Sequence, residues 1–210
     1  MKKLISKLTP VQWLAVALIL VGVAIMIPRA KGMFDFYKEA RYASENNFAD
    51  GNLSPELLRP WMSIRYIAVA YAVPQQYLFD SLKIQPKKET SMIGINRLNQ
   101  QMGLGKVDGQ PVLLTTVRES ILEYRAHPVV TGLIEKHVED WMTMQYIANS
   151  SGVPALVIFE KIGIPANGNA FKPLGFLSDQ VNYPGGTKAL IAAVQKIVDA
   201  QGVKPIPVTP

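Results

Sequence analysis

One segment of this 210-residue chain is written twice, and that repeat restricts the possible folds more than any other feature. Residues 61–84 align with residues 141–164 at an offset of 80 positions without a gap, and nine of the 24 aligned positions are identical. The identities include a Trp-Met pair at the start of each segment and a Val-Pro pair near its middle. A match of this density indicates a duplication, so we expect both segments to fold into the same structure.

The match weakens further along the chain, but it continues. Asn99 falls on Asp179, and a shortening by three residues then aligns Val117 with Val194. Each copy therefore has about 60 to 65 residues, long enough for several short helices around a small core. The predicted copies are residues 61–126 (copy 1) and 141–202 (copy 2).

Both copies carry the start and stop signals of short helices. Ser63 and Thr143 are natural N-caps for a first helix, and apolar residues follow them at helical spacing. Gly152 suits a left-handed C-cap after this helix, and Ala72 takes its place in copy 1 at some conformational cost. A second helix is then predicted to open at the proline of each Val-Pro pair. No segment shows convincing strand alternation.

Two further helices complete each copy. A third helix is predicted at about residues 92–103 in copy 1 and 172–182 in copy 2. The fourth is clearest in copy 2, where we expect Thr187 to cap it and Gly202 to end it. Its apolar residues form one stripe, namely Leu190, Ile191, Val194, Ile197 and Val198. The sequence thus predicts an all-α fold that contains two tandem copies of a small four-helix module.

An apolar segment precedes the repeat. Residues 11–27 contain neither a charged residue nor proline. A helix of this length spans ~26 Å, close to the ~30 Å hydrocarbon core of a membrane. We therefore expect an N-terminal transmembrane helix, although a basic start and an apolar middle also occur in cleaved signal peptides. The aromatic residues expected at the two membrane interfaces are Trp13, Phe34, Phe36 and Tyr37.

Basic residues flank this segment on both sides. Lys2, Lys3 and Lys7 favour an N-terminus inside the cytoplasm, whereas Arg29 and Lys31 weaken that asymmetry. They also explain most of the net charge of +6, because the rest of the chain carries 17 basic and 16 acidic residues. The predicted location is the cytoplasmic membrane, crossed once, with the repeats outside the cytoplasm. The other predicted segments are an anchor at 1–31, a juxtamembrane helix and linker at 32–60, a connecting helix at 127–140 and a proline-rich tail at 203–210.

Side chains that could carry chemistry are few and scattered. The chain has no cysteine, which excludes disulfides, thiolate metal sites and a cysteine nucleophile. His137 and Asp140 lie three residues apart beside Glu135 and Glu139, but a charged, solvated helix face explains this cluster better than a metal site. We expect no catalytic residue, no bound metal and no cofactor.

Two glycine loops need a separate explanation. The sequence reads G-L-G-K at 103–106 and G-G-T-K at 185–188, and neither is a complete phosphate-binding motif. Both loops precede the last helix of their copy, so we interpret them as loop geometry that the repeat shares. The Trp-Met pairs recur in the same way and are predicted to belong to the core.

The stretch 143–164 also resembles a known module. It reads I-A at 147–148, G-V-P at 152–154 and F-E-K-I-G-I-P at 159–165. This pattern resembles a small helical module of bacterial membrane proteins, often attached to cytochrome-b-like or ferredoxin-like redox proteins. Copy 1 departs from it at Ala72 and Gln85, where the pattern has Gly and Pro. The resemblance implies a helical module near membrane redox machinery and no particular chemistry.

The same pattern is similar to a helix-turn-helix, which raises a DNA-binding alternative. A recognition helix presents Arg, Lys, Asn or Gln to base edges. Residues 155–163 contain a single basic residue, and residues 75–83 include the acidic Asp80. The repeats are also close to neutral, whereas phosphate binding requires positive charge. A membrane-tethered DNA-binding regulator is therefore our second hypothesis.

Our first hypothesis is a non-catalytic, membrane-anchored accessory or scaffold subunit that binds proteins in a membrane complex. Residues 69–79 of copy 1 are rich in aromatic and apolar side chains, which suits a protein contact. The predicted contact residues are Tyr71, Gln75, Gln76 and Tyr77, although the seam between the two copies would explain them equally well. We expect the lipid bilayer and proteins as partners, and neither nucleic acid nor a small-molecule ligand.

Overall fold

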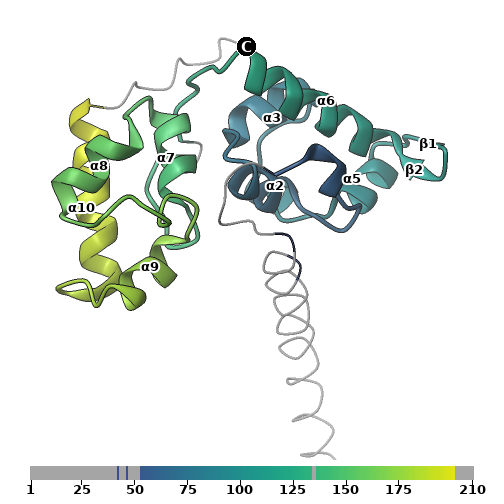
Figure 1. Cartoon of the computed structure of the whole chain (residues 1–210). Helices are drawn as coiled ribbons and strands as arrows, with labels where there is room; N and C mark the ends of the chain where they lie inside the picture. The colour runs from purple at the N-terminus through teal and green to yellow at the C-terminus, as the bar shows by residue number, and fades with distance from the viewer. Residues whose placement is uncertain (1–41, 43–45, 47–52, 134–135, 202–210) are drawn as a thin grey trace, which may run out of the picture. The chain divides into compact units, whose positions relative to one another are not determined.

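The fold is taken from a computed structural model that describes residues 42, 46, 53–133 and 136–201 (Figure 1). The chain divides into two compact units, residues 1–46 and 47–210. In the first unit the described residues are Tyr42 and Asn46, and the backbone N of Asn46 donates to the Tyr42 carbonyl at 3.2 Å. Both copies of the repeat lie in the second unit.

The prediction of a single pass through the cytoplasmic membrane is wrong for the part of the chain that the structure describes. Among the described residues, no helix is both long and apolar enough to cross a bilayer. The longest of these helices has 16 residues, or about 24 Å against the ~30 Å that a membrane core requires. Residues 11–27 and the interface residues Trp13, Phe34, Phe36 and Tyr37 lie outside the described residues. So does the part of the predicted juxtamembrane helix and linker up to residue 52, apart from Tyr42 and Asn46.

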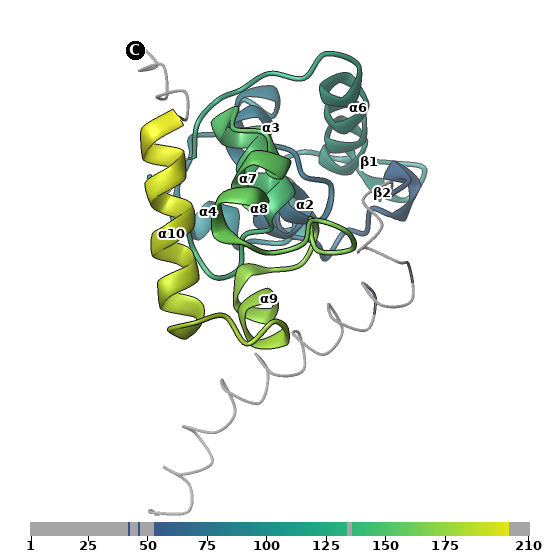
Figure 2. The same ribbon diagram turned by 60° about the vertical axis from the view of Figure 1, so that its left-hand side comes forward.

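Copy 1 consists of short helices and one hairpin. Its elements are α2 (Ile64–Ala70), α3 (Gln75–Ser81), α4 (Lys88–Ser91), α5 (Ile95–Gln101), β1 (Lys106–Val107), β2 (Gln110–Pro111) and α6 (Val112–Ala126), and the short helix η3 (Pro55–Leu57) precedes them. The long helix α6 packs against η3, α3 and α5 (Figures 1 and 2). Its buried face consists of Leu113, Leu114, Val117, Ser120, Ile121 and Tyr124. This face supplies one wall of the copy 1 core.

Copy 2 repeats the plan with fewer elements. They are α7 (Met144–Ser151), α8 (Ala155–Ile162), α9 (Leu174–Gln180) and α10 (Gly186–Gln201). Helix α10 packs against α8 and α9, and both figures show it along them. The core includes Tyr146, Ile147, Phe159, Leu177 and Val194, each at most 1% exposed. The described residues are thus mostly helical, as the predicted all-α class requires, and the hairpin of copy 1 was not predicted.

The predicted N-caps of the first helices are confirmed. The Ser63 hydroxyl oxygen accepts from the backbone N of Tyr66 at 3.2 Å, and the Thr143 hydroxyl oxygen accepts from that of Tyr146 at the same distance. Each cap residue also forms an isolated antiparallel bridge, to Gly94 in copy 1 and to Pro173 in copy 2. The duplicated sequence therefore yields a duplicated set of local hydrogen bonds.

The alignment of the third helices needs a correction by one residue. The bridges pair Ser63 with Gly94 and Thr143 with Pro173, so the offset between the copies is 79 at this point and not 80. Asn99 consequently corresponds to Ser178 and not to Asp179. The offset then becomes 77 in the last helices, where Val117 and Val194 are both fully buried, as predicted.

Three local predictions were wrong. The prolines of the Val-Pro pairs, Pro74 and Pro154, occupy the N-cap of the second helix and not its first helical position. Thr187 lies inside α10, because that helix already begins at Gly186. The described residues of the segment 127–140 contain no helix. Pro128 explains part of this result, since it disfavours the helical conformation of the residue before it.

The left-handed turn predicted after the first helix is confirmed in both copies. Gly152 has φ 77° and is the C-cap of α7. Ala72, its counterpart, has φ 51° and follows the C-cap of α2. A non-glycine residue costs roughly 1 kcal/mol or more in this conformation, so copy 1 holds the turn at the expense of local strain.

One buried amide holds the hairpin of copy 1 in place. The Asn99 Nδ2 donates to the carbonyls of Leu104 at 2.8 Å and Gly105 at 3.0 Å. Its Oδ1 accepts from the backbone N of Leu113 at 2.9 Å, in the first turn of α6. The hairpin turn itself has positive φ at Asp108 and Gly109, as a type I′ turn requires. Copy 2 has Ser178 at the place of Asn99 and a shorter connection.

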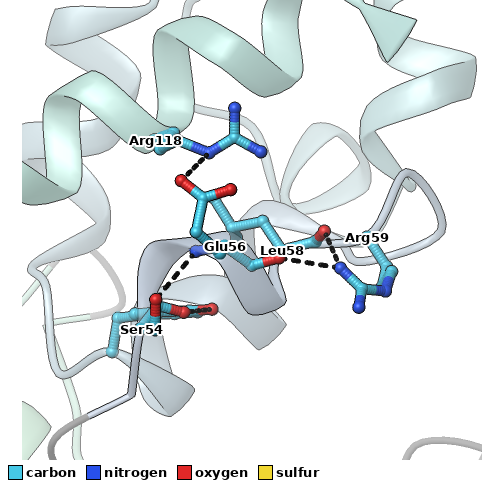
Figure 3. A network of polar contacts seen from close by, with 6 residues as sticks. Ser54, Glu56, Leu58, Arg59 and Arg118 are labelled. Carbon is cyan, nitrogen blue, oxygen red and sulfur yellow. Dashed lines mark hydrogen bonds and ion pairs between the residues drawn. The ribbon is translucent and has the colours of Figure 1, made fainter. Parts of the chain in front are cut away.

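The segment before copy 1 is attached to α6 by polar contacts (Figure 3). The Arg118 Nε lies 3.4 Å from a carboxylate oxygen of Glu56, and the figure shows Arg59 turned back onto the end of η3. The Arg59 Nη1 donates to the carbonyls of Glu56 and Leu58, both at 2.9 Å. Because η3 is a single short turn with few hydrogen bonds of its own, these contacts help to hold it in place.

We expect Asn99→Ala to destabilise the chain by about 2–3 kcal/mol, because it leaves the buried backbone N of Leu113 without its partner and removes one donor from the carbonyls of Leu104 and Gly105. Urea denaturation followed by circular dichroism measures this loss. The matched control is Gln100→Ala, an exposed position on the same helix, which should change stability by less than about 0.5 kcal/mol. Equal losses in the two variants would show that Asn99 does not hold the loop.

Candidate protein-contact surface

The four contact residues predicted in copy 1 do not form one exposed patch. Tyr71 is 4% exposed and Gln75 is 1% exposed, while Gln76 and Tyr77 are half-buried. Buried side chains offer no surface to a partner, so the prediction is wrong for Tyr71 and Gln75 in this fold. A contact role stays a prediction for Gln76 and Tyr77.

Contacts inside the chain explain why these residues are apolar or aromatic. The Tyr71 hydroxyl donates to the Ser54 carbonyl at 3.2 Å, and the Arg125 guanidinium lies 5.8 Å from the centre of the Tyr71 ring. The ring of Tyr77 lies 5.2 Å from that of Tyr124 on α6. The aromatic excess of copy 1 therefore contributes to packing on its own side, whereas the alternative had placed these residues at a seam between the two copies.

A small seam joins the two copies. The Asn149 Nδ2 on α7 donates to the Ala72 carbonyl at 2.6 Å, and the Gln145 Nε2 donates to the Asn149 Oδ1 at 2.8 Å. The Arg65 guanidinium on α2 lies 4.0 Å from the centre of the Trp141 ring, a cation–π contact. The closely packed helix pairs of the described residues all lie within one copy, so the seam depends on these few contacts.

A cavity of about 280 Å³ lies at this seam. Gln75 and Phe79 contribute to it from α3, Glu139 contributes from the connector, and Trp141 contributes from the start of copy 2. Lys87 and Lys88 also line it. Since both lysines are exposed, their charge is largely screened by water.

The larger hollow, of about 420 Å³, lies at the turn between α7 and α8. We name it the α8 groove. Its walls are the end of α6, the connector between the copies, α7 and the first residues of α8. The residues that line it are Tyr124, Pro128, Val129, Val130, Gln145, Ala148, Asn149, Gly152, Val153, Pro154, Ala155 and Leu156. None of these side chains is charged.

Local sequence rules place the walls of the α8 groove. Gly152, in the left-handed conformation, turns the chain sharply. The side chain of Val153 is only 2% exposed and anchors this turn in the core. Pro154 then caps α8, which leaves Leu156 in its first turn at 65% exposure. On the opposite side the backbone N of Gly132 donates to the Ser150 carbonyl at 2.8 Å, which ties the connector to α7.

Apolar side chains in the α8 groove are unusually open to solvent. Val129 is 44% exposed and Val130 is 43% exposed, and Leu156 is more exposed than either. Single exposed apolar residues are ordinary, but three of them around one hollow mark a candidate binding surface. The sequence predictions did not include these residues. The signal was present, because Leu156 occupies the position where copy 1 has Gln76.

One tyrosine of the α8 groove has an altered acidity. Burial raises the pKa of Tyr124 to about 12, and the neighbouring Tyr77 adds to this effect. The Tyr124 hydroxyl therefore stays protonated throughout the physiological range and remains a hydrogen-bond donor. The other polar groups of the groove are the amides of Gln145 and Asn149, which do not titrate.

The remaining candidates from the sequence do not form sites in the described part of the chain. No three His, Asp or Glu side chains gather there as metal ligands would, and Glu135 of the predicted cluster lies outside it. Gly103 and Gly185 both have positive φ, 66° and 81°, which agrees with a structural role of the glycine loops. Trp61 is 41% exposed, so the prediction that this residue belongs to the core is wrong.

No known protein family, no curated protein and no solved structure matches this chain.

The raised pKa of Tyr124 predicts a loss of stability at high pH. An unfolded tyrosine has a pKa of ~10, so the unfolded state releases its proton first as pH rises. The free energy of unfolding should therefore be highest below pH ~10 and should fall until the folded pKa of about 12 is passed. Urea denaturation between pH 9 and 12 (about three units around the two pKa values) measures this fall.

The matched control is Tyr124→Phe, in which this pH dependence should be weaker. Absorbance at the tyrosinate band gives a second readout, because the difference between wild type and variant should titrate near pH 12. A difference spectrum with its midpoint near pH ~10, the value of a free tyrosine, would contradict the prediction.

The cation–π contact of the seam predicts an energetic coupling. In a double-mutant cycle, Arg65→Ala and Trp141→Leu should show a coupling energy of about 0.5–1 kcal/mol in urea denaturation. Arg97, an exposed residue of α5, supplies the matched control. The cycle of Arg97→Ala with Trp141→Leu should show no coupling, and equal values in both cycles would count against the contact.

Proposed function

We propose that this chain is a non-catalytic accessory or scaffold protein that binds another polypeptide through the α8 groove. The observation that carries the proposal is Leu156, a large apolar side chain that is 65% exposed at the edge of an uncharged hollow. Burying such a side chain in a contact gains roughly 1.5–3 kcal/mol relative to leaving it in water. Together with Val129 and Val130 it forms the kind of apolar centre around which protein interfaces are built.

The polar groups of the α8 groove support binding over catalysis. Its side-chain hydrogen-bonding groups are the phenol of Tyr124 and the amides of Gln145 and Asn149. These groups orient a ligand but exchange no proton near neutral pH. The His127 imidazole lies 2.9 Å from the Glu123 carboxylate on an exposed turn, where water surrounds both groups. Neither of these two residues lines the groove.

The DNA-binding alternative has weaker support. Helix α8 exposes Leu156, Glu160 and Lys161, an apolar residue and a pair of opposite charges. The Gln76 Nε2 of α3 donates to the Asp80 carboxylate at 2.7 Å, which occupies the amide that would otherwise read a base. Both second helices thus present the wrong chemistry for a negatively charged duplex.

Site-specific cross-linking tests the proposal. A photoreactive amino acid at position 156 of the full chain, expressed in its host cells, should produce a discrete cross-linked product that contains a second polypeptide. The matched control is position 122, a leucine of α6 that is 52% exposed but lies outside the α8 groove. It should give at least about tenfold less product, because the photoreactive group there lies outside the proposed contact.

Two outcomes would contradict the proposal. Equal products from positions 156 and 122 would show that the α8 groove has no special role. Retention of the full chain on duplex DNA at low salt, with loss as salt rises, would favour the DNA-binding alternative, because phosphate contacts have that signature.

A further inference from the structure

We infer that the proline-rich tail, residues 203–210, binds in the α8 groove as an extended segment and competes there with the protein partner. The competition rests on the proposed function of the groove, whereas the binding of the tail does not. The tail lies outside the described residues. Its reach, the open backbone of the connector and the spacing of its prolines identify it as the occupant.

The reach of the tail is sufficient. Helix α10 ends at Gln201 and packs against α8, and Figures 1 and 2 both show its C-terminal end at the same end of copy 2 as the turn between α7 and α8. The eight residues of α8 cover ~12 Å. Residues 202–210 in an extended conformation cover up to ~28 Å, at ~3.1 Å per residue. The tail can therefore cross the groove without any change in the fold.

The connector offers an open backbone along one wall of the groove. Val129 and Val130 lie in an exposed, non-helical stretch after α6. The backbone of residues 129–131 forms no hydrogen bond to the backbone of another described residue. The end of this stretch is held in place, because the backbone N of Gly132 donates to the Ser150 carbonyl. An open stretch of this kind can pair with an added strand through main-chain hydrogen bonds.

The spacing of the prolines suits the tail to such pairing. The tail reads V-K-P-I-P-V-T-P, with Pro205 and Pro207 two residues apart. In an extended strand the backbone groups of alternate residues point to the same edge. Both prolines therefore lie on one edge, where their missing N–H groups prevent pairing. Lys204, Ile206 and Val208 present complete N–H and C=O groups on the other edge. The tail can thus pair with one strand, and the connector supplies it.

The side chains of the tail fit the chemistry of the groove. Ile206 and Val208 point to the same face of an extended strand, because they are two residues apart. The residues that line the groove are apolar or neutral, and its volume of about 420 Å³ lies in the ~300–1,000 Å³ range of ligand pockets. Lys204 is the one charged side chain of the tail and is closer to α10 along the chain. Its long aliphatic stem lets the ammonium group stay in water.

Tethering favours the tail over a free peptide of the same sequence. A short flexible linker gives an effective concentration in the millimolar range. A contact with a dissociation constant of ~1 mM for the free peptide would then be about half occupied within the chain. A protein partner binds only while the groove is free, so the tail lowers its apparent affinity. The tail thereby regulates access to the groove.

Disulfide trapping tests the binding of the tail. The full chain has no cysteine, so Leu156→Cys combined with Ile206→Cys creates a single pair. This pair should form a disulfide within one chain, at a rate independent of protein concentration, because a disulfide requires Cα atoms within ~7 Å. The matched control combines Leu122→Cys with Ile206→Cys, since Leu122 is exposed but lies outside the groove. Mobility on a non-reducing gel should show a rate at least about tenfold lower for the control.

Truncation tests the competition. A chain that ends at Gln201 should give at least about twofold more photo-cross-linked product at position 156 than the full chain, because no tail then occupies the groove. The small amount of product at position 122 should not change, since that position lies outside the groove. An unchanged product at position 156 would contradict the competition.

The two experiments separate the inference from the proposed function. Equal disulfide rates at positions 156 and 122 would overturn the inference. If the rates are equal while position 156 of the full chain cross-links to a second polypeptide, the proposed function stands and the inference fails. If the disulfide at position 156 forms selectively but the truncated chain cross-links no more there than at position 122, the tail is the occupant and the proposed function fails.

Discussion

The backbone bridge at the start of each first helix is the contact on which the rest of the module depends. It joins Ser63 to Gly94 in copy 1 and Thr143 to Pro173 in copy 2, so the first and third helices begin at fixed places relative to each other. Gly94 shows how close this approach is, because a Cβ atom there would lie 2.7 Å from the Trp61 carbonyl oxygen. The frame is made of main-chain contacts, and side chains outside it can diverge between the copies without loss of the fold.

That freedom explains how one module produces two different surfaces. In copy 1 the turn after the first helix is buried, and the outer edge of the second helix begins with the polar, half-buried Gln76. In copy 2 the same turn is open, and the corresponding edge begins with Leu156. The backbone is equivalent in both places, since Ala72 and Gly152 share a left-handed conformation. The difference between a closed turn and an open groove therefore comes from what packs against the turn.

Features that depend on a few neighbouring residues could be predicted from the sequence. The caps at Ser63 and Thr143 and the left-handed Gly152 are of this kind, because each depends on hydrogen bonds within one helical turn. The hairpin was missed because its support is remote, since Asn99 reaches Leu113 across 14 residues. The prediction of a connecting helix was wrong for a related reason. The backbone N of Gly132 in this segment donates to the Ser150 carbonyl on α7, and no local sequence pattern predicts such a contact.

The contact residues predicted in copy 1 are buried or half-buried, and the reason is physical. An apolar or aromatic side chain packs equally well in a protein core and in an interface, so the residue type alone does not predict which of the two it belongs to. Tyr71 found its partners in Ser54 and Arg125 of its own chain, and these are 17 and 54 positions away. A more informative comparison is between matched positions of the two copies. Copy 2 has Leu156, which is 65% exposed, where copy 1 has the half-buried Gln76, and the proposed protein contact rests on this difference.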